Sequence, residues 1–353
     1  MNIIGQSLGI DIAAKSFQVC LQIKQADGHC KIKGSRSFPN TAKGIVALEQ
    51  WLAKRLHSEL ALAVVMEATG VYYETLAYSL DEAGYRVHVL LPNRIKGYLK
   101  FLNVKSKTDK IEAKALAQLG LDQQLPVWQA ASPQMYSLKR LCRERNILVD
   151  EKTMISNRFH AEVSCKTPEP FTVKRLKQRL KLVDKQIQEV EGQLKQLVAR
   201  DEVLSRHLEN ICQVKGLGFT TVISIIAETN GFALVDHKSQ LVSYAGYDVV
   251  ERQSGSSVKG RTRISKKGNA HIRRALHFPA LSVVKHHDEF KALFTRVLER
   301  TQIKMKGYVA VQRKLLVLIY TLYKKEQAYD PTYAQKQTQE QRGRQDTMPA
   351  YAG

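Results

Sequence analysis

The spacing of apolar and polar residues predicts an α/β domain at the start of the chain. Three strands are expected over residues 2–12, 17–24 and 31–38, and the short turns between them indicate an antiparallel meander. Helical and strand patterns then alternate, over 41–57, 60–67, 71–83 and 85–91, and helices continue to about Gly120. This alternation predicts parallel strands added to the meander.

The next apolar pattern is helical and long. From Leu176 the apolar positions recur at alternating intervals of four and three residues, at Leu176, Leu180, Val183, Ile187, Val190, Leu194 and Leu197. This spacing predicts a coiled-coil seam. A weaker row from Leu138 to Phe159 is a candidate antiparallel partner, with a turn at 167–170. The pattern leaves open whether the helices pair within one chain or form a dimerisation arm.

These patterns predict four regions along the chain. They are an α/β domain, a helical coiled-coil connector, a mainly helical C-terminal domain and a tail, over residues 1–125, 126–210, 211–326 and 327–353. The tail is rich in Gln, Gly and Arg and lacks apolar periodicity, so we expect it to be disordered.

Charge adds an anionic partner to this picture. The formal net charge is +22 at pH 7, and basic residues outnumber acidic ones in every region except the tail. An excess of this size favours an extended polyanion, above all nucleic acid. The five cysteines are scattered without a Cys-x-x-Cys pair, which argues against a disulfide framework or a zinc site. No leader and no apolar run near the length of a membrane span are present, so we expect a cytoplasmic protein without a membrane partner.

Four acidic residues stand out against this basic background. Asp11 lies in the apolar run of the first strand, and Glu67 ends the fourth. Asp109 and Glu112 are three residues apart on a helix that Thr108 can cap, so they share one face. A carboxylate in a buried strand is costly unless it is paired or bound to a metal, and the set favours Mg ions and phosphate chemistry. Each acid alone also fits a solvated face or a turn.

Acids at the first strand, the fourth strand and a late helix, on a meander with parallel extensions, indicate a ribonuclease-H-like architecture. The N-terminal domain resembles the RuvC-type resolvase nucleases. That resemblance implies Mg-dependent chemistry on nucleic acid strands.

A glycine-rich turn in the C-terminal domain is a candidate phosphate contact. Lys215, Gly216 and Gly218 lie between an amphipathic helix and a strongly apolar one. The pattern resembles a helix-hairpin-helix element, in which backbone N–H groups approach a phosphate. A plain turn between helices is the alternative, because glycine is common at helix ends.

The stretch from Arg252 to Arg274 has eight Lys or Arg residues and no acid. Such a stretch suits contact with a phosphate backbone. Its basic residues are Arg252, Lys259, Arg261, Arg263, Lys266, Lys267, Arg273 and Arg274. Ser254 is a candidate nucleophile, because the glycine after it lets the backbone present the hydroxyl. Ser256 and Ser257 lie close by and leave the choice of serine open.

Together these motifs resemble one family along nearly the whole chain. They are Gly9-Ile10-Asp11, Glu67-Ala68-Thr69-Gly70, residues 107–113, Tyr244-Ala245-Gly246, Gln253-Ser254-Gly255 and residues 264–269. The chain is similar to the DEDD-motif insertion-sequence transposases, which are related to Piv-type DNA invertases and regarded as bridge-RNA-guided recombinases. The resemblance implies that Asp11, Glu67, Asp109 and Glu112 form a metal-binding tetrad and that Ser254 is the nucleophile. Glu112 stands where the family usually has Asp, and its longer side chain changes the reach to a second metal ion.

The resemblance also implies a mechanism and partners. DNA strands would be cleaved and exchanged through a phosphoserine intermediate, assisted by Mg, with donor and target DNA selected by a guide RNA. A homodimer or tetramer would be held by the helices of 126–210, because the acids and the serine come from different domains. Two alternatives stay open: a RuvC-like, structure-selective nuclease that uses activated water, and a non-catalytic nucleic-acid-binding protein.

Overall fold

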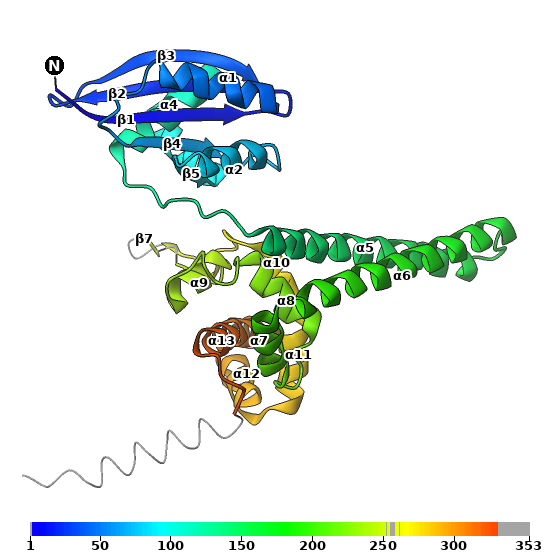
Figure 1. Cartoon of the computed structure of the whole chain (residues 1–353). Helices are drawn as coiled ribbons and strands as arrows, with labels where there is room; N and C mark the ends of the chain where they lie inside the picture. Colours follow the sequence, from blue (N-terminus) through cyan, green and yellow to red (C-terminus); the bar gives the residue numbers. More distant parts are fainter. Residues whose placement is uncertain (1, 252, 255–257, 261, 331–353) are drawn as a thin grey trace, which may run out of the picture. The chain divides into compact units, whose positions relative to one another are not determined.

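The computed structural model describes residues 2–251, 253–254, 258–260 and 262–330, and the elements are labelled in Figure 1. The chain divides into two compact units, Met1–Ala130 and Ala131–Gly353. The division falls within residues 124–132, which contain neither helix nor strand. The helical connector is therefore part of the second unit, and residues 331–353 of the tail lie outside the described residues.

The first unit is built on one five-stranded sheet. Its strands are β1 (Ile3–Ile12), β2 (Ser16–Gln25), β3 (Cys30–Pro39), β4 (Leu62–Glu67) and β5 (Arg86–Leu90). Their order is β3-β2-β1-β4-β5. β1, β2 and β3 pair antiparallel, whereas β4 runs parallel to both β1 and β5. This topology confirms the predicted meander with its parallel extension.

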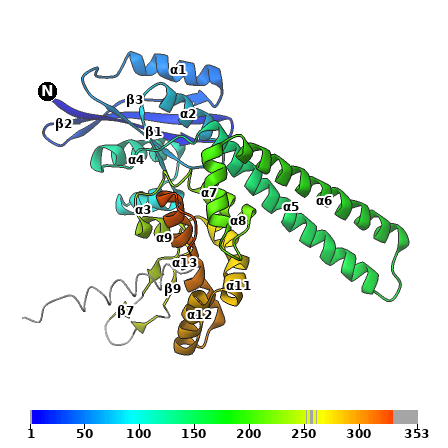
Figure 2. The same cartoon turned by 60° about the horizontal axis from the view of Figure 1, so that its bottom comes forward.

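Helices cover both faces of this sheet (Figure 2). They are α1 (Ala42–Ala53), α2 (Glu74–Glu82), α3 (Pro92–Phe101) and α4 (Asp109–Asp122). Leu48 of α1 and Leu76 of α2 belong to one buried cluster with β1 and β2. Ile95 of α3 and Leu116 of α4 belong to a second cluster with β4 and β5. Each face of the sheet therefore has its own apolar core.

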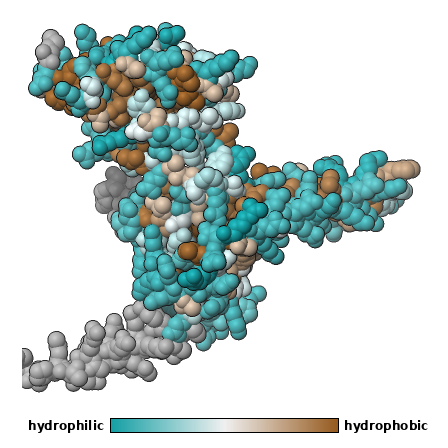
Figure 3. Space-filling model, viewed as in Figure 1, coloured by the Kyte–Doolittle hydropathy of each residue, from teal (hydrophilic) through white to brown (hydrophobic). Residues whose placement is uncertain are grey.

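The second unit begins with a two-helix arm, α5 (Pro133–Ser164) and α6 (Pro170–Ala199), drawn in green in Figures 1 and 2. Ile155 of α5 and Val183 of α6 are buried in one cluster, with Phe159 and Leu180 packed against it. The two apolar rows predicted from the sequence thus pack against each other within one chain. The outer surface of the arm is mostly hydrophilic on the face shown in Figure 3.

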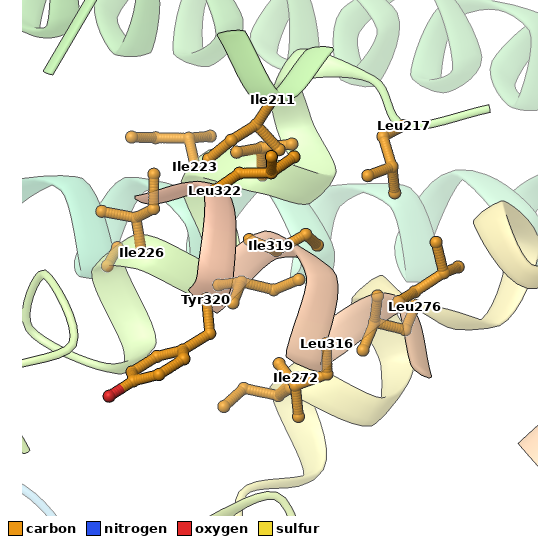
Figure 4. Packing of buried hydrophobic residues seen from close by; sticks show 14 of the residues in the cluster. Ile211, Leu217, Ile223, Ile226, Ile272, Leu276, Leu316, Ile319, Tyr320 and Leu322 are labelled. Carbon is orange, nitrogen blue, oxygen red and sulfur yellow. The ribbon is translucent and has the colours of Figure 1, made fainter. Parts of the chain in front are cut away.

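The rest of the second unit is mainly helical, as predicted. Its helices are α7 (Glu202–Cys212), α8 (Phe219–Glu228), α9 (Lys238–Tyr244), α10 (Ala270–Ala275), α11 (His277–His286), α12 (Asp288–Thr301) and α13 (Lys304–Lys325). Figure 4 shows Leu316 and Ile319 of α13 surrounded by apolar residues of α7, α8 and α10 and by Leu276, which lies between α10 and α11. No helix among the described residues is long and apolar enough to cross a membrane.

Four very short strands separate α9 from α10. They are β6 (Val249–Val250), β7 (Gln253–Ser254), β8 (Val258–Lys259) and β9 (Arg263–Ile264). β6 pairs with β9, and β7 pairs with β8, in both cases antiparallel. The sequence predicted only a basic loop here, because two-residue strands are too short to produce a period-two pattern.

Candidate active site

Strand alternation places two of the predicted carboxylates on one face of the sheet. Ile10 of β1 packs in the core beneath α1, so its neighbour Asp11 points to the α4 face. Val65 of β4 packs against α3 and α4, so Glu67, two residues later, points to the same face. β1 and β4 are adjacent and parallel, with Ile10 opposite Met66. Asp11 and Glu67 therefore lie together at the carboxyl ends of neighbouring strands.

Close packing of α4 brings the other two acids to this corner. The Thr108 hydroxyl accepts the N–H of Ile111 at 3.3 Å, which starts the helix with Asp109 and Glu112 in its first turn. A Cβ on Gly9 of β1 would lie 2.0 Å from the carbonyl oxygen of Ala113. At the other end of the helix, a Cβ on Gly120 would lie 2.3 Å from the Ser7 hydroxyl. These glycines let α4 lie directly on β1.

The four acids affect one another electrostatically. Burial raises the pKa of Asp11 to about 6, together with the charges of its neighbours Glu112, Asp109 and Glu67. Burial and the charge of Glu112 also raise the pKa of Glu67. Two cations partly offset this charge: the Lys107 ammonium lies 3.4 Å from Glu112 Oε1, and the charges of Lys107 and Lys96 act to lower the pKa of Glu67. The corner is thus a site of concentrated, incompletely balanced negative charge.

In its chemistry this corner fits a divalent cation. Carboxylate oxygens are the ligands that Mg²⁺ prefers, and a cation would relieve the repulsion that helps to raise the pKa of Asp11. However, no three His, Cys, Asp or Glu side chains within the described part of the chain form a group that could hold a metal ion. The backbone brings the four acids to one corner without a finished set of ligands.

The proposed nucleophile lies on a β-hairpin in the second unit. β6 and β9 form its base, and β7 and β8 continue it. Ser254 ends β7, where its backbone pairs with Val258. The hairpin therefore holds this serine by antiparallel pairing instead of in an irregular loop. Four further residues that the sequence analysis singled out in this segment lie outside the described residues. They are Arg252, Ser256, Ser257 and Arg261.

Polar contacts fix the base of the hairpin. The carboxylate of Asp248 accepts hydrogen bonds from the hydroxyls of Ser243 and Ser265, at 3.2 and 3.3 Å. The backbone N–H of Ser265 donates to the Asp248 carbonyl at 2.7 Å. Arg273 Nη1 donates to the carbonyl of Ala245 at 2.7 Å. Both ends of the hairpin are thus tied to the helices beside it.

Two glycines let separate sequence motifs meet at this base. Gly246 has a φ of +73°, a conformation that glycine adopts without strain. A Cβ on Gly268 would lie 2.5 Å from the carbonyl oxygen of Tyr244 and 2.6 Å from the nitrogen of Gly246. The N–H of Asn269 donates to the Tyr244 carbonyl at 2.7 Å. The motifs at 244–246 and 264–269 therefore form one packed structure.

A buried ion pair beneath this structure was not expected from the sequence. The side chain of Glu228 is 1% exposed and accepts two hydrogen bonds from Arg143 of α5, at 2.7 and 2.9 Å. Asn269 Nδ2 donates to the same carboxylate at 2.7 Å. Burial acts to raise the pKa of Glu228, but these hydrogen bonds and the Arg143 charge outweigh it and hold the pKa below its usual value. A lone acid at the end of the apolar helix 219–228 was the available signal.

The basic residues of this segment separate into two groups. Arg263, Lys266 and Lys267 are exposed. Arg273 is used at the base of the hairpin, and Arg274 makes two hydrogen bonds of 2.5 and 2.6 Å to the carboxylate of Asp150 in α5. The first group is available to a nucleic acid, whereas the second has partners inside the protein.

The glycine-rich turn joins α7 to α8. Gly216 has a φ of +102°, and a Cβ there would lie 2.9 Å from a methyl carbon of Val283. The Lys215 side chain is exposed, and its carbonyl accepts a hydrogen bond from the ring of His287 at 2.9 Å. Gly218 precedes the first residue of α8 with open space around it. Its contact with a phosphate stays a prediction.

Comparison with known proteins agrees with these motifs in both units. A transposase family model, named for the DEDD transposases of IS110, matches residues 8–164. A second model, described as the transposase IS116/IS110/IS902 family, matches residues 208–295. Together the two models span well over half of the chain.

Similar proteins carry related names. The pilin gene-inverting protein of Moraxella lacunata is 26% identical over 327 residues, which are 92% of this chain and 97% of the relative. The transposase for insertion sequence element IS1328 of Yersinia enterocolitica is 24% identical, over 76% of this chain and 81% of the relative.

Among solved structures, RuvC of Thermus thermophilus is 14% identical, with a TM-score of 0.27 over 35% of this chain and 99% of that chain. The same protein in complex with a Holliday junction substrate gives 13% identity and a TM-score of 0.24, over 32% and 90% of the two chains. TM-scores of this size add nothing to the sheet order described above. The two family models decide the matter: this chain belongs to the IS116/IS110/IS902 family of transposases, which are DNA-recombining enzymes.

Proposed function

We propose that this transposase cleaves and exchanges DNA strands through a serine nucleophile, assisted by a divalent metal ion and directed by a guide RNA. The observation that carries the proposal is the gathering of Asp11, Glu67, Asp109 and Glu112 at one corner of the sheet, where Asp11 has a pKa of about 6. The ion pair of Lys107 with Glu112 does not balance this gathering, since burial and the charges of the other three acids together still raise the pKa of Asp11.

The proposed chemical step uses the hydroxyl of Ser254. Its oxygen attacks a DNA phosphorus, so a phosphorus–oxygen bond to serine forms while the bond to the departing deoxyribose oxygen breaks. The serine loses its proton, and the departing oxygen gains one. A hydroxyl of another strand then reverses the reaction, which reseals DNA without an external energy source because the number of phosphoester bonds is conserved. The hairpin that holds Ser254 supports this role by fixing its backbone.

The metal ion, proposed to be Mg²⁺, would be held by the four acids. When bound, it supplies positive charge against the negative charge that develops on the phosphate. The acids themselves would provide its oxygen ligands, and Lys107 would remain as a cation beside Glu112. We infer that Glu112 serves in place of the family's usual Asp, because either side chain offers carboxylate oxygens.

The guide RNA and self-assembly are further parts of the proposal. The charge of +22, spread over both units, supports contact with more nucleic acid than one short DNA site requires. Exposed apolar residues on the α5–α6 arm, including Ile147, Met154 and Leu182, support a homodimer or tetramer. Sequencing of RNA that co-purifies with the protein tests the first idea, and light scattering tests the second. We place the reaction in the bacterial cytoplasm, on nucleoid DNA.

A covalent intermediate separates the proposal from its alternatives. Wild-type protein should form an adduct with end-labelled donor DNA that migrates as a protein–DNA species in denaturing gels. Ser254→Ala should abolish both the adduct and strand exchange, whereas Ser256→Ala and Ser257→Ala should retain them. Cleavage by Ser254→Ala without any adduct in the wild type would indicate a nuclease that uses water. Absence of cleavage in every protein, with DNA binding intact, would indicate a non-catalytic binding protein.

A further inference from the structure

A large groove lies in the second unit, and the base of the serine hairpin forms part of its wall. Its volume is about 1560 Å³, and it is lined by parts of α9, β6, β9, α12 and α13. Figure 2 shows α9 beside α13, with β9 and α12 nearby. We name it the C-terminal groove. It is much larger than a typical small-molecule site, which occupies about 300–1,000 Å³.

The rim of the C-terminal groove is strongly basic. Eight Lys or Arg residues line it, and Asp236 is the one Asp or Glu in its lining. Arg296 and Arg300 come from α12, and Arg313 comes from α13; all three are exposed. Of the eight cations, Lys314 alone forms an ion pair with an acid of the described chain, Glu289. The other cations are therefore available to an anionic ligand.

The floor of the groove is apolar. Val297 of α12 and Val309 and Val317 of α13 line it, and all three are half-buried. Three exposed arginines of the rim come from the same two helices. On α12, Arg296 and Arg300 are four residues apart and share one face of the helix, and Val297 lies beside that face. The groove thus offers charge along its edges and apolar surface between them.

This combination matches one class of ligand. A duplex presents phosphates on its outside and keeps its bases stacked inside, so an apolar floor would gain little from it. A single strand presents both phosphates and unstacked bases, and proteins bind such strands in basic grooves that also contact base surfaces. A protein partner is disfavoured, because it would need an acidic rim and an apolar ridge together.

We propose that the C-terminal groove binds a single-stranded segment of nucleic acid, with phosphates against the arginine rim and bases against the valine floor. Arg263 and Ile264 of β9 belong to its wall, and they also form the base of the hairpin that carries Ser254. A strand in the groove is thereby led towards the serine. This inference rests on the proposed recombination function. DNA and RNA share the chemistry that the groove recognises.

The test removes two rim charges from the full-length protein. Arg300→Gln with Arg313→Gln is compared with Lys285→Gln with Lys291→Gln, which removes the same charge from exposed positions outside the groove. Fluorescence anisotropy measures binding of a labelled single-stranded DNA, a single-stranded RNA of the same sequence and the matching DNA duplex. Ultraviolet crosslinking of thiouridine- or thiothymidine-containing strands, followed by peptide mass spectrometry, locates the contact.

The groove variant should bind single strands at least about tenfold more weakly, and the slope of log affinity against log salt should fall by about 1.4, because two phosphate contacts are lost. The lysine variant should change much less, and crosslinks should fall within residues 293–317. Loss for only DNA or only RNA identifies the natural strand. Equal losses in both variants, equal losses for duplex and single strand, or crosslinks confined to other segments would overturn the proposal.

The Ser254 adduct assay keeps this result separate from the proposed function. An adduct that depends on Ser254, together with unchanged strand binding by the groove variant, refutes the groove and leaves the recombinase intact. Weakened strand binding by the groove variant, in a protein that never forms an adduct, supports the groove and refutes the serine mechanism.

Discussion

Asp11 and Glu228 are two partly or fully buried carboxylates in environments of opposite kind. Burial, together with the charges of three acidic neighbours, raises the pKa of Asp11 to about 6. Glu228 is more deeply buried, yet Arg143 and Asn269 hold its pKa below the usual value. Burial alone therefore does not distinguish an active-site acid from a structural one. The charges and hydrogen bonds of the neighbours differ: Glu228 has a cationic partner and an amide donor, whereas the neighbours that act on Asp11 are acids, which is the environment in which we propose a metal ion.

The largest expected difference between the two acids is in catalysis. Asp11→Asn should reduce strand cleavage by about 10³-fold or more, because a divalent ion contributes several kcal/mol of charge stabilisation and the amide is a poorer ligand. Binding of DNA at physiological salt should change little. Glu59→Gln, at an exposed position in the same unit, is the matched control. Full cleavage activity in Asp11→Asn would remove the metal role from this corner.

The next effect concerns stability of the second unit. Glu228→Gln should lower the free energy of unfolding by about 2–3 kcal/mol, because Arg143 loses its counter-charge and the new amide opposes the amide of Asn269. Urea denaturation measures this change, with the exposed Glu209→Gln as control.

The stabilising effect of Glu228 should also depend on pH. Its folded pKa lies below the unfolded value of 4.5, so its contribution is present above that pH and is lost as pH falls through the folded pKa. Wild-type and Glu228→Gln stabilities should therefore converge on acidification. Parallel stability curves from neutral pH to pH 3 would show that Glu228 is not held as an ion pair.

The smallest effect has the opposite sign. In metal-free protein, Asp11→Asn should raise the stability of the first unit by about 1 kcal/mol, since it removes repulsion and desolvation of a charge at a partly exposed site. The raised pKa means that this penalty is absent below pH 3.8, the unfolded value, and complete above the folded value of about 6. Thermal unfolding in chelator at pH 5 and pH 8 measures it. A wild type that is more stable than the variant at pH 8 would contradict the comparison.

The sequence predicted the first unit well because its signals are local. Each strand and helix carried its own period, and connection rules predicted the antiparallel meander with its parallel extension, which the sheet has. The four acids were singled out for the same reason, since each lies within the last two residues of a strand or in the first turn of a helix. Their role as metal ligands stays a prediction. The role of Gly9 and Gly120 was not visible, because the contact of α4 with β1 joins residues about a hundred positions apart.

The second unit was predicted less completely because its key contacts are long-range. Glu228 lies 85 residues from Arg143 and 41 from Asn269, so no local pattern pairs them. The C-terminal groove is assembled from α9, β6, β9, α12 and α13, and each contributes a spacing that is ordinary for a surface helix or strand. The basic excess was visible, but the sorting of its arginines into structural and exposed groups was not.

Side-chain contacts of α5 with α8 and α10, the helices beside the hairpin base, limit how far the arm can be exchanged between relatives. Arg143 donates to Glu228, and Asp150 accepts from Arg274. The first half of α5 is therefore fixed to the helices beside the serine hairpin. A chimera in which a relative's arm begins before Arg143 would replace Arg143 and so change the partner of the buried Glu228. A junction beyond Asp150 on α5, with its counterpart on α6, would leave both contacts intact, and that is where the length of the arm can be redesigned independently of the hairpin.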